Sequence, residues 1–172
     1  MKEVLFLATV AALAGCAGST EHVHSAYAGQ ESRAVKSLSE QEVKGLLEGA
    51  GMGYAKAAEL NRYPGPMHTL ELASSMGLSA AQRKSIEELL QRHKAEAREL
   101  GSRVLAGEKD LDQLFASGVA DPNKLTAVLN ALATEQAALR ASHLKAHLAT
   151  TALLSPEQVE RYQSLRGYAS AR

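Results

Sequence analysis

The 172-residue sequence contains one cysteine, no tryptophan and only two phenylalanines. A single cysteine excludes internal disulfide bonds. The shortage of aromatic side chains predicts a core of leucine and alanine, which suits close helix packing and leaves few aromatic anchors for a ligand pocket. Basic and acidic residues number 19 each, so no basic field indicates a nucleic acid partner. No alternating pattern typical of strands occurs, and no apolar run is long enough to cross a membrane as a helix.

The N-terminus resembles a bacterial export signal. Residues 4–14 form an apolar stretch of a length typical of signal peptides, and Leu-Ala-Gly-Cys at residues 13–16 matches the bacterial lipobox. We therefore expect residues 1–15 to be a lipoprotein signal peptide and Cys16 to carry a lipid anchor facing the periplasm. The alternative is an ordinary secreted protein in which this cysteine occurs by chance. Ala17 stands where aspartate would signal inner-membrane retention, which favours the outer membrane over the inner one.

The rest of the chain divides into a tether and one helical domain. Residues 16–37 are polar and rich in serine, glycine and histidine, and we expect them to form a flexible tether from the membrane. Residues 38–172 have the length of a single domain.

Helix starts within this domain are marked by capping motifs. Leu-Ser-x-x-Gln occurs at residues 78–82 and 154–158, and each copy predicts a capping box in which Ser and Gln bond each other's backbone N–H. Helices are expected over about 39–60, 67–76, 80–117, 122–153 and 156–168. Apolar residues at alternating steps of three and four predict antiparallel packing of the two long helices, with Gly101 and Gly107 as bend points. The expected fold is all-α, a bent antiparallel helical hairpin with short helices folded against it.

These features together resemble the periplasmic Spy/CpxP family, whose hallmark is a twice-occurring Leu-Thr-x-x-Gln. Serine replaces the threonine in both copies here, a conservative change at a helix cap. Pro-Gly-Pro-Met-His at residues 64–68 and the histidines at 143 and 147 resemble the heavy-metal-resistance branch, which includes the CnrX and ZraP types. The resemblance implies a bent four-helix protomer that forms an antiparallel, cradle-shaped homodimer. Members of the family act as ATP-independent chaperones, as inhibitors of sensor kinases, or as metal sensors that hold an anti-sigma system.

Four histidines are candidate metal ligands. His143 and His147 are four residues apart on one helix face, a spacing that lets two imidazoles bind one ion. A hairpin turning near residue 120 places His93 opposite His147, and His68 lies on the short helix 67–76. Such a set would suit Zn, Ni, Co or Cu(II). The alternative is that these are core histidines, hydrogen-bonded to Gln136 or to backbone carbonyls.

Three functions follow from these patterns. The first is a metal-binding periplasmic sensor or buffer, whose partner would be an anti-sigma factor or a sensor kinase. The second is a chaperone that binds unfolded client proteins, or a stress inhibitor of the Spy/CpxP type. The third is a structural lipoprotein that pairs with another envelope protein. We expect no enzyme activity, because the sequence brings no nucleophile together with a base and an orienting group.

Overall fold

The computed structural model describes residues 25–168, which contain seven helices and no strand. The predicted signal peptide, Cys16 and the first part of the tether lie outside these residues. The expectation of an all-α fold built on a long helical hairpin is confirmed. Among the described residues, no helix combines the length and the apolar character that crossing a membrane requires.

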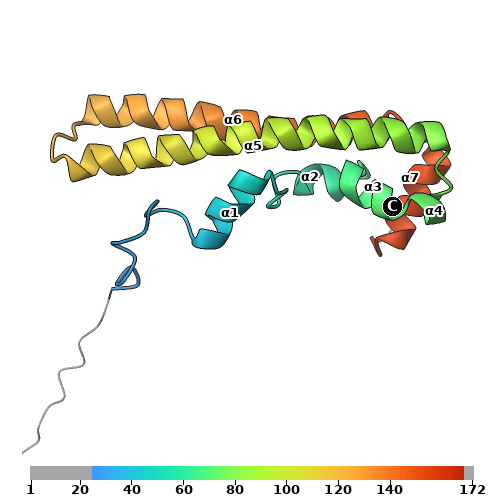
Figure 1. Cartoon of the computed structure of the whole chain (residues 1–172), viewed down its shortest axis with the longest axis horizontal. Coiled ribbons are helices and arrows are strands. Elements are labelled where there is room, and N and C mark those ends of the chain that lie inside the picture. Colours follow the sequence, from blue (N-terminus) through green and yellow to red (C-terminus); the bar gives the residue numbers. More distant parts are fainter. Residues whose placement is uncertain (1–24, 169–172) are drawn as a thin grey trace, which may run out of the picture. The chain divides into compact units, whose positions relative to one another are not determined.

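The hairpin consists of α5 (Ala80–Ala116) and α6 (Pro122–Thr151), which lie side by side along their length (Figure 1). Each begins with a side-chain cap, because Ser79 accepts from the Gln82 N–H and Asp121 accepts from two backbone N–H groups of the first turn. The core between these helices is formed by leucine, valine and alanine side chains, as the composition predicted: Ala97, Leu100, Val104, Leu105, Leu132 and Leu139.

Four shorter helices precede the hairpin and line one side of it (Figure 1). These are α1 (Glu40–Glu48), α2 (Lys56–Glu59), α3 (Pro66–Glu71) and α4 (Ala73–Met76). The single helix expected over 39–60 is broken into α1 and α2. Gly49 ends α1 in the left-handed conformation at φ 64°, and Gly53 repeats this conformation at φ 79°. Such positive φ angles favour glycine and end a helix.

Two glycines of α5 allow a neighbouring helix to approach closely, and α5 continues without a break at both. A Cβ atom at Gly101 would overlap the backbone carbonyl of Leu46 in α1. At Gly107 the same atom would lie 3.0 Å from the Leu132 Cδ1 atom of α6. The bend points expected at these glycines are therefore places where a neighbouring helix comes close.

The last helix, α7 (Pro156–Leu165), is joined to the start of the hairpin by the two Leu-Ser-x-x-Gln motifs. Both capping boxes form as predicted. In addition, the two glutamines bond each other. Gln82 Nε2 donates to Gln158 Oε1 at 2.8 Å, and Gln158 Nε2 donates to Gln82 Oε1 at 3.1 Å. The repeated motif therefore caps two helices and ties their N-termini together.

The compact unit that contains the hairpin begins at Ser32. Val35 is 4% exposed and packs in the hairpin core, and Lys36 forms an ion pair of 2.7 Å with Asp112 of α5. Ser37 donates to Glu108 at 2.6 Å. The end of the segment that the sequence predicted as a flexible tether is thus attached to α5.

Candidate functional site

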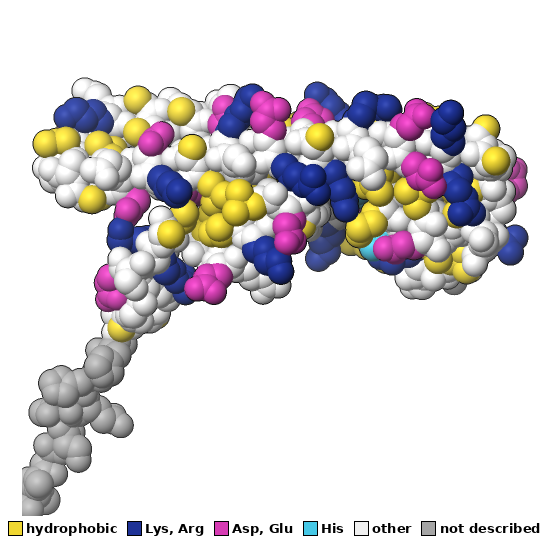
Figure 2. All heavy atoms as spheres, viewed as in Figure 1, with side chains coloured by type: hydrophobic (Ala, Val, Ile, Leu, Met, Phe, Trp, Pro, Cys, Tyr) yellow, Lys and Arg dark blue, Asp and Glu magenta, His cyan; other side chains and the backbone are white. Residues whose placement is uncertain are grey.

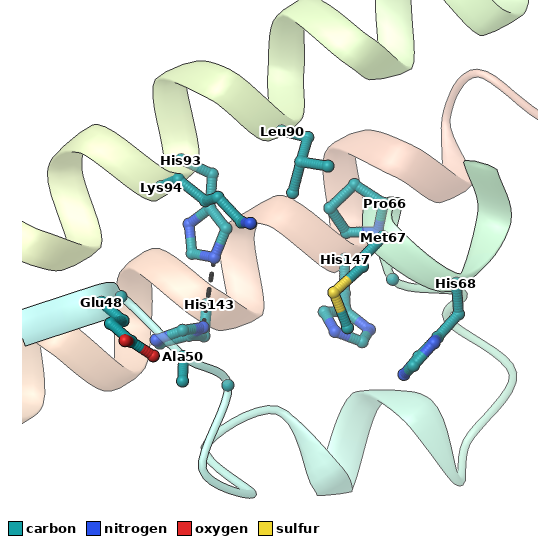
Figure 3. A pocket seen from close by; sticks show the side chains of 13 residues that line it. Glu48, Ala50, Pro66, Met67, His68, Leu90, His93, Lys94, His143 and His147 are labelled. Atoms are coloured by element: carbon teal, nitrogen blue, oxygen red, sulfur yellow. Dashed lines mark hydrogen bonds between the residues drawn. The ribbon is translucent and has the colours of Figure 1, made fainter. Parts of the chain in front are cut away.

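A cavity of about 300 Å³ lies between the hairpin and the segment that covers it. All four predicted histidines line it: His68 from α3, His93 from α5, and His143 and His147 from α6 (Figure 3). The remaining walls include Glu48, Met67, Leu90, Lys94 and the glycines at 49, 51 and 65. Met76 of α4 is 3% exposed and belongs to the core.

His93 meets a different part of α6 from the one that the sequence predicted. Its Nε2 atom lies 3.1 Å from His143 Nδ1, and its Nδ1 atom lies 3.3 Å from Ser142 Oγ. The expected partner, His147, lies one helical turn further along α6. A contact between residues 93 and 143 centres the hairpin on residue 118, in the loop between the end of α5 at Ala116 and the start of α6 at Pro122.

A chain of hydrogen bonds orients His143. Ser142 donates its single hydroxyl proton to Glu96 Oε2 at 2.9 Å, so its oxygen accepts the N–H of His93 Nδ1. His93 is therefore protonated on Nδ1, and its Nε2 atom accepts the hydrogen bond from His143 Nδ1–H. The Nε2 atom of His143 is then unprotonated. It is buried and has no hydrogen-bond partner among the described residues.

Burial keeps this histidine pair neutral. His143 is 4% exposed, and desolvation, with the nearby His93 and His147, lowers its pKa from 6.5 to about 4. Desolvation also lowers the pKa of His93, against the opposing effect of Glu96. The ring of Tyr54 stacks on His143 with centroids 5.4 Å apart. At neutral pH the Nε2 atom of His143 therefore carries a lone pair.

His147 and His68 adopt the same tautomer. His147 Nδ1 donates to the Tyr63 carbonyl at 2.7 Å, and His68 Nδ1 donates to Glu71 Oε2 at 2.8 Å. In each ring the proton is on Nδ1, so Nε2 carries the lone pair. A Cβ atom at Gly65 would lie 2.7 Å from His147 Nε2, so any larger residue at this position would force the ring to shift.

Hydrogen bonding of this kind is typical of metal-binding histidines, which donate one ring N–H to a protein acceptor and bind the ion through the other nitrogen. Both nitrogens of His93 are engaged, which makes it the residue that orients His143. Among residues 25–168, however, no three His, Cys, Asp or Glu side chains are grouped so as to hold a metal ion as they stand.

The alternative interpretation, core histidines, receives partial support. His147 does bond a backbone carbonyl. Gln136 instead donates to Glu108, at 3.4 Å.

Sequence reasoning missed the residues that hold the cavity histidines in place. Ser142 could have been suspected as the neighbour of His143. Tyr63 acts through its backbone carbonyl, which no sequence pattern reveals. Glu59 ends a four-residue helix and lies beside His147 only because of the fold, with its Oε2 atom 3.7 Å from His147 Nδ1.

The sequence pattern of one protein family, described as heavy-metal resistance, matches residues 47–161. This stretch reaches from the end of α1 into α7 and includes all four cavity histidines. No curated protein and no solved structure matches the chain.

Proposed function

The chain belongs to the heavy-metal resistance family of Spy/CpxP-like proteins, and on this premise we propose that it binds a transition metal ion and senses or buffers it. The family membership supports a role in heavy-metal resistance. The binding site that we propose is the histidine cavity.

One observation carries this proposal: three imidazoles around one cavity have Nδ1 bonded to a protein partner and Nε2 left as a lone pair. His143 and His147 of α6 would hold the ion, and His68 and water would complete its coordination. Neutral imidazole suits Zn, Ni, Co and Cu(II). Met67 also lines the cavity, and its thioether would add affinity for Cu(I).

The cellular setting is part of the proposal. A signal peptide over residues 1–15 and lipid on Cys16 would place the domain in the periplasm, with the outer membrane favoured over the inner one. As a homodimer, the protein would report metal to a membrane-bound anti-sigma factor or a sensor kinase. It would have no catalytic role.

The direct test is a calorimetric titration of the purified protein with Zn, Ni and Cu(II). We expect a dissociation constant in the micromolar range or below, which corresponds to about 8 kcal/mol or more. The double variant His143→Ala/His147→Ala should lose this binding while circular dichroism shows an unchanged helix content.

A matched control comes from the tether, where His22 and His24 form a second histidine pair. The double variant His22→Ala/His24→Ala should bind as the wild type does. Equal weak binding by the wild type and the His143/His147 variant would refute the proposal.

Exposed apolar side chains favour a second candidate function, a chaperone for unfolded proteins. Leu47, Leu60, Tyr63 and Met67 are each 40–52% exposed and all belong to the segment that covers the hairpin. Figure 2 shows apolar groups between charged side chains on this segment. A surface of this kind suits apolar stretches of an unfolded chain.

For this second function we expect the purified protein to suppress light scattering from a thermally aggregating test protein at stoichiometric ratios. Replacing Leu47 and Leu60 by serine should weaken the suppression, whereas serine at Ala133, an exposed alanine of α6, should not. Full aggregation in the presence of the wild type would exclude the chaperone function.

A further inference from the structure

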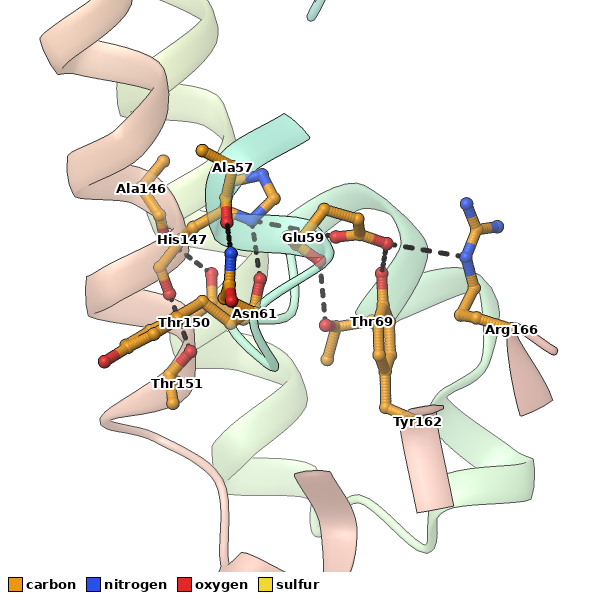
Figure 4. A network of polar contacts seen from close by, with 12 residues as sticks. Ala57, Glu59, Asn61, Thr69, Ala146, His147, Thr150, Thr151, Tyr162 and Arg166 are labelled. Atoms are coloured by element: carbon orange, nitrogen blue, oxygen red, sulfur yellow. Dashed lines mark hydrogen bonds and ion pairs between the residues drawn. The ribbon is translucent and has the colours of Figure 1, made fainter. Parts of the chain in front are cut away.

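A largely buried carboxylate, that of Glu59, connects the cavity to the last helix. Glu59, at the end of α2, has a side chain that is 13% exposed. Its Oε1 atom accepts the hydroxyl proton of Tyr162 at 2.6 Å (Figure 4). The same atom accepts the hydroxyl proton of Tyr168 at 2.9 Å. Arg166, the residue that follows α7, places its Nε atom 3.6 Å from the same oxygen. Three groups from the C-terminal end of the chain therefore converge on one oxygen.

The second oxygen of Glu59 faces the cavity histidine. Oε2 is buried, has no hydrogen-bond partner among the described residues, and lies 3.7 Å from His147 Nδ1 (Figure 4). The Nδ1–H group itself is donated to the Tyr63 carbonyl. Glu59 thus places negative charge beside Nδ1 of His147, whereas the lone pair of this ring is on Nε2.

From this arrangement we infer that Glu59 is the positioning residue of His147, and that it couples occupancy of the cavity to the docking of α7. The inference rests on the proposed metal-binding function. When His147 donates its Nε2 lone pair to a cation, its Nδ1–H becomes more acidic and more positive. A carboxylate beside that N–H stabilises the bound state, most strongly where little water screens the interaction.

The coupling extends to α7 because the same carboxylate holds Tyr162 and Tyr168. Burial raises the pKa of Tyr162, with the adjacent Glu59 acting in the same direction, so the hydroxyl stays protonated and remains a donor. Arg62, which precedes the Tyr63 carbonyl, forms an ion pair with Glu160 of α7. The segment that contacts His147 is therefore tied to α7 at two points. Coupling of this kind is reciprocal, so metal binding should stabilise the docked α7.

The first part of the test is a double-mutant cycle with Zn. Glu59→Gln should weaken Zn binding about 10–100-fold, the range expected when the outer partner of a metal-binding histidine is removed. In the His147→Ala background the same substitution should change affinity less than about twofold, because the residue through which Glu59 acts is missing. Glu88→Gln, which alters an exposed carboxylate of α5, serves as the control and should bind as the wild type does.

The second part measures hydrogen exchange of α7 amides with and without Zn. Zn should slow exchange over residues 156–165 in the wild type and in Glu88→Gln. Zn should not slow exchange in Glu59→Gln, which removes the carboxylate charge. It should not slow exchange in Tyr162→Phe either, where the carboxylate charge remains but one hydrogen bond to α7 is lost.

The outcomes separate the two proposals. Absence of Zn, Ni and Cu(II) binding by the wild type would overturn both. Zn binding that Glu59→Gln leaves unchanged, or weakens equally in the His147→Ala background, would overturn only the role of Glu59. Zn-dependent protection that persists in Tyr162→Phe would overturn the coupling to α7.

Discussion

Replacing Gly101 with alanine is expected to lower the free energy of unfolding by about 2 kcal/mol. Alanine in a helix interior would normally gain up to about 1 kcal/mol over glycine. Here the new Cβ atom would overlap the Leu46 carbonyl. A backbone carbonyl cannot rotate away as a side chain can, so α1 has to move off the hairpin, and Leu46, which is 3% exposed, would lose its packing.

Gly107→Ala in the same helix is the matched control. Its Cβ atom would meet the end of the Leu132 side chain, which can shift by a few tenths of an ångström. We expect a change within about 1 kcal/mol, because the strain is offset by the better helix propensity of alanine. Urea denaturation measures both variants, and hydrogen exchange over residues 45–49 would show the loosening of α1. Equal stabilities of the two variants would contradict the close contact.

Acidification of the metal-free protein from pH 7 to pH 5 is expected to cost about 2 kcal/mol of stability through His143 alone. Its pKa is about 4 in the folded protein and near 6.5 for an exposed histidine. Between these values the unfolded chain binds a proton that the folded chain does not, so stability is lost as pH falls through this window. The cause is burial, because a charged imidazole at this position would be desolvated beside two other histidines.

His143→Gln removes the titrating group while keeping a polar side chain. With EDTA present, the loss of stability between pH 7 and pH 5 should shrink by about 2 kcal/mol relative to the wild type. Urea denaturation at several pH values measures both proteins. An identical pH dependence in the two would show that His143 is not the source of acid sensitivity. Measurements above pH 5 also avoid most carboxylate titration, so the change in stability reports on histidine. Glu42 is among the carboxylates avoided, because its hydrogen bonds to Ser39 lower its pKa.

The two Leu-Ser-x-x-Gln motifs show how far local sequence reaches. Each capping box joins residues three apart, so the sequence alone predicted it. The mutual bonds of Gln82 and Gln158 link positions 76 residues apart, and they exist only because α7 folds back onto the start of α5.

The candidate site divides in the same way. The spacing of His143 and His147 puts both on one face of any helix that contains them, whatever surrounds it. Which residue faces His93 depends on the length of the turn and on core packing, and a shift of one helical turn replaced His147 by His143.

The sequence by itself determined the helical class, the starts of the long helices and the four histidines that line the cavity, since caps and periodicity act over three or four residues. Only the tertiary structure decided the hairpin register, the tautomers of the histidines and the place of Glu59. These depend on which groups are buried together, and burial is a property of the packed chain. Among the described residues, the His143 Nε2 lone pair and the Glu59 Oε2 atom are both buried without a hydrogen bond, because distant segments exclude water from them.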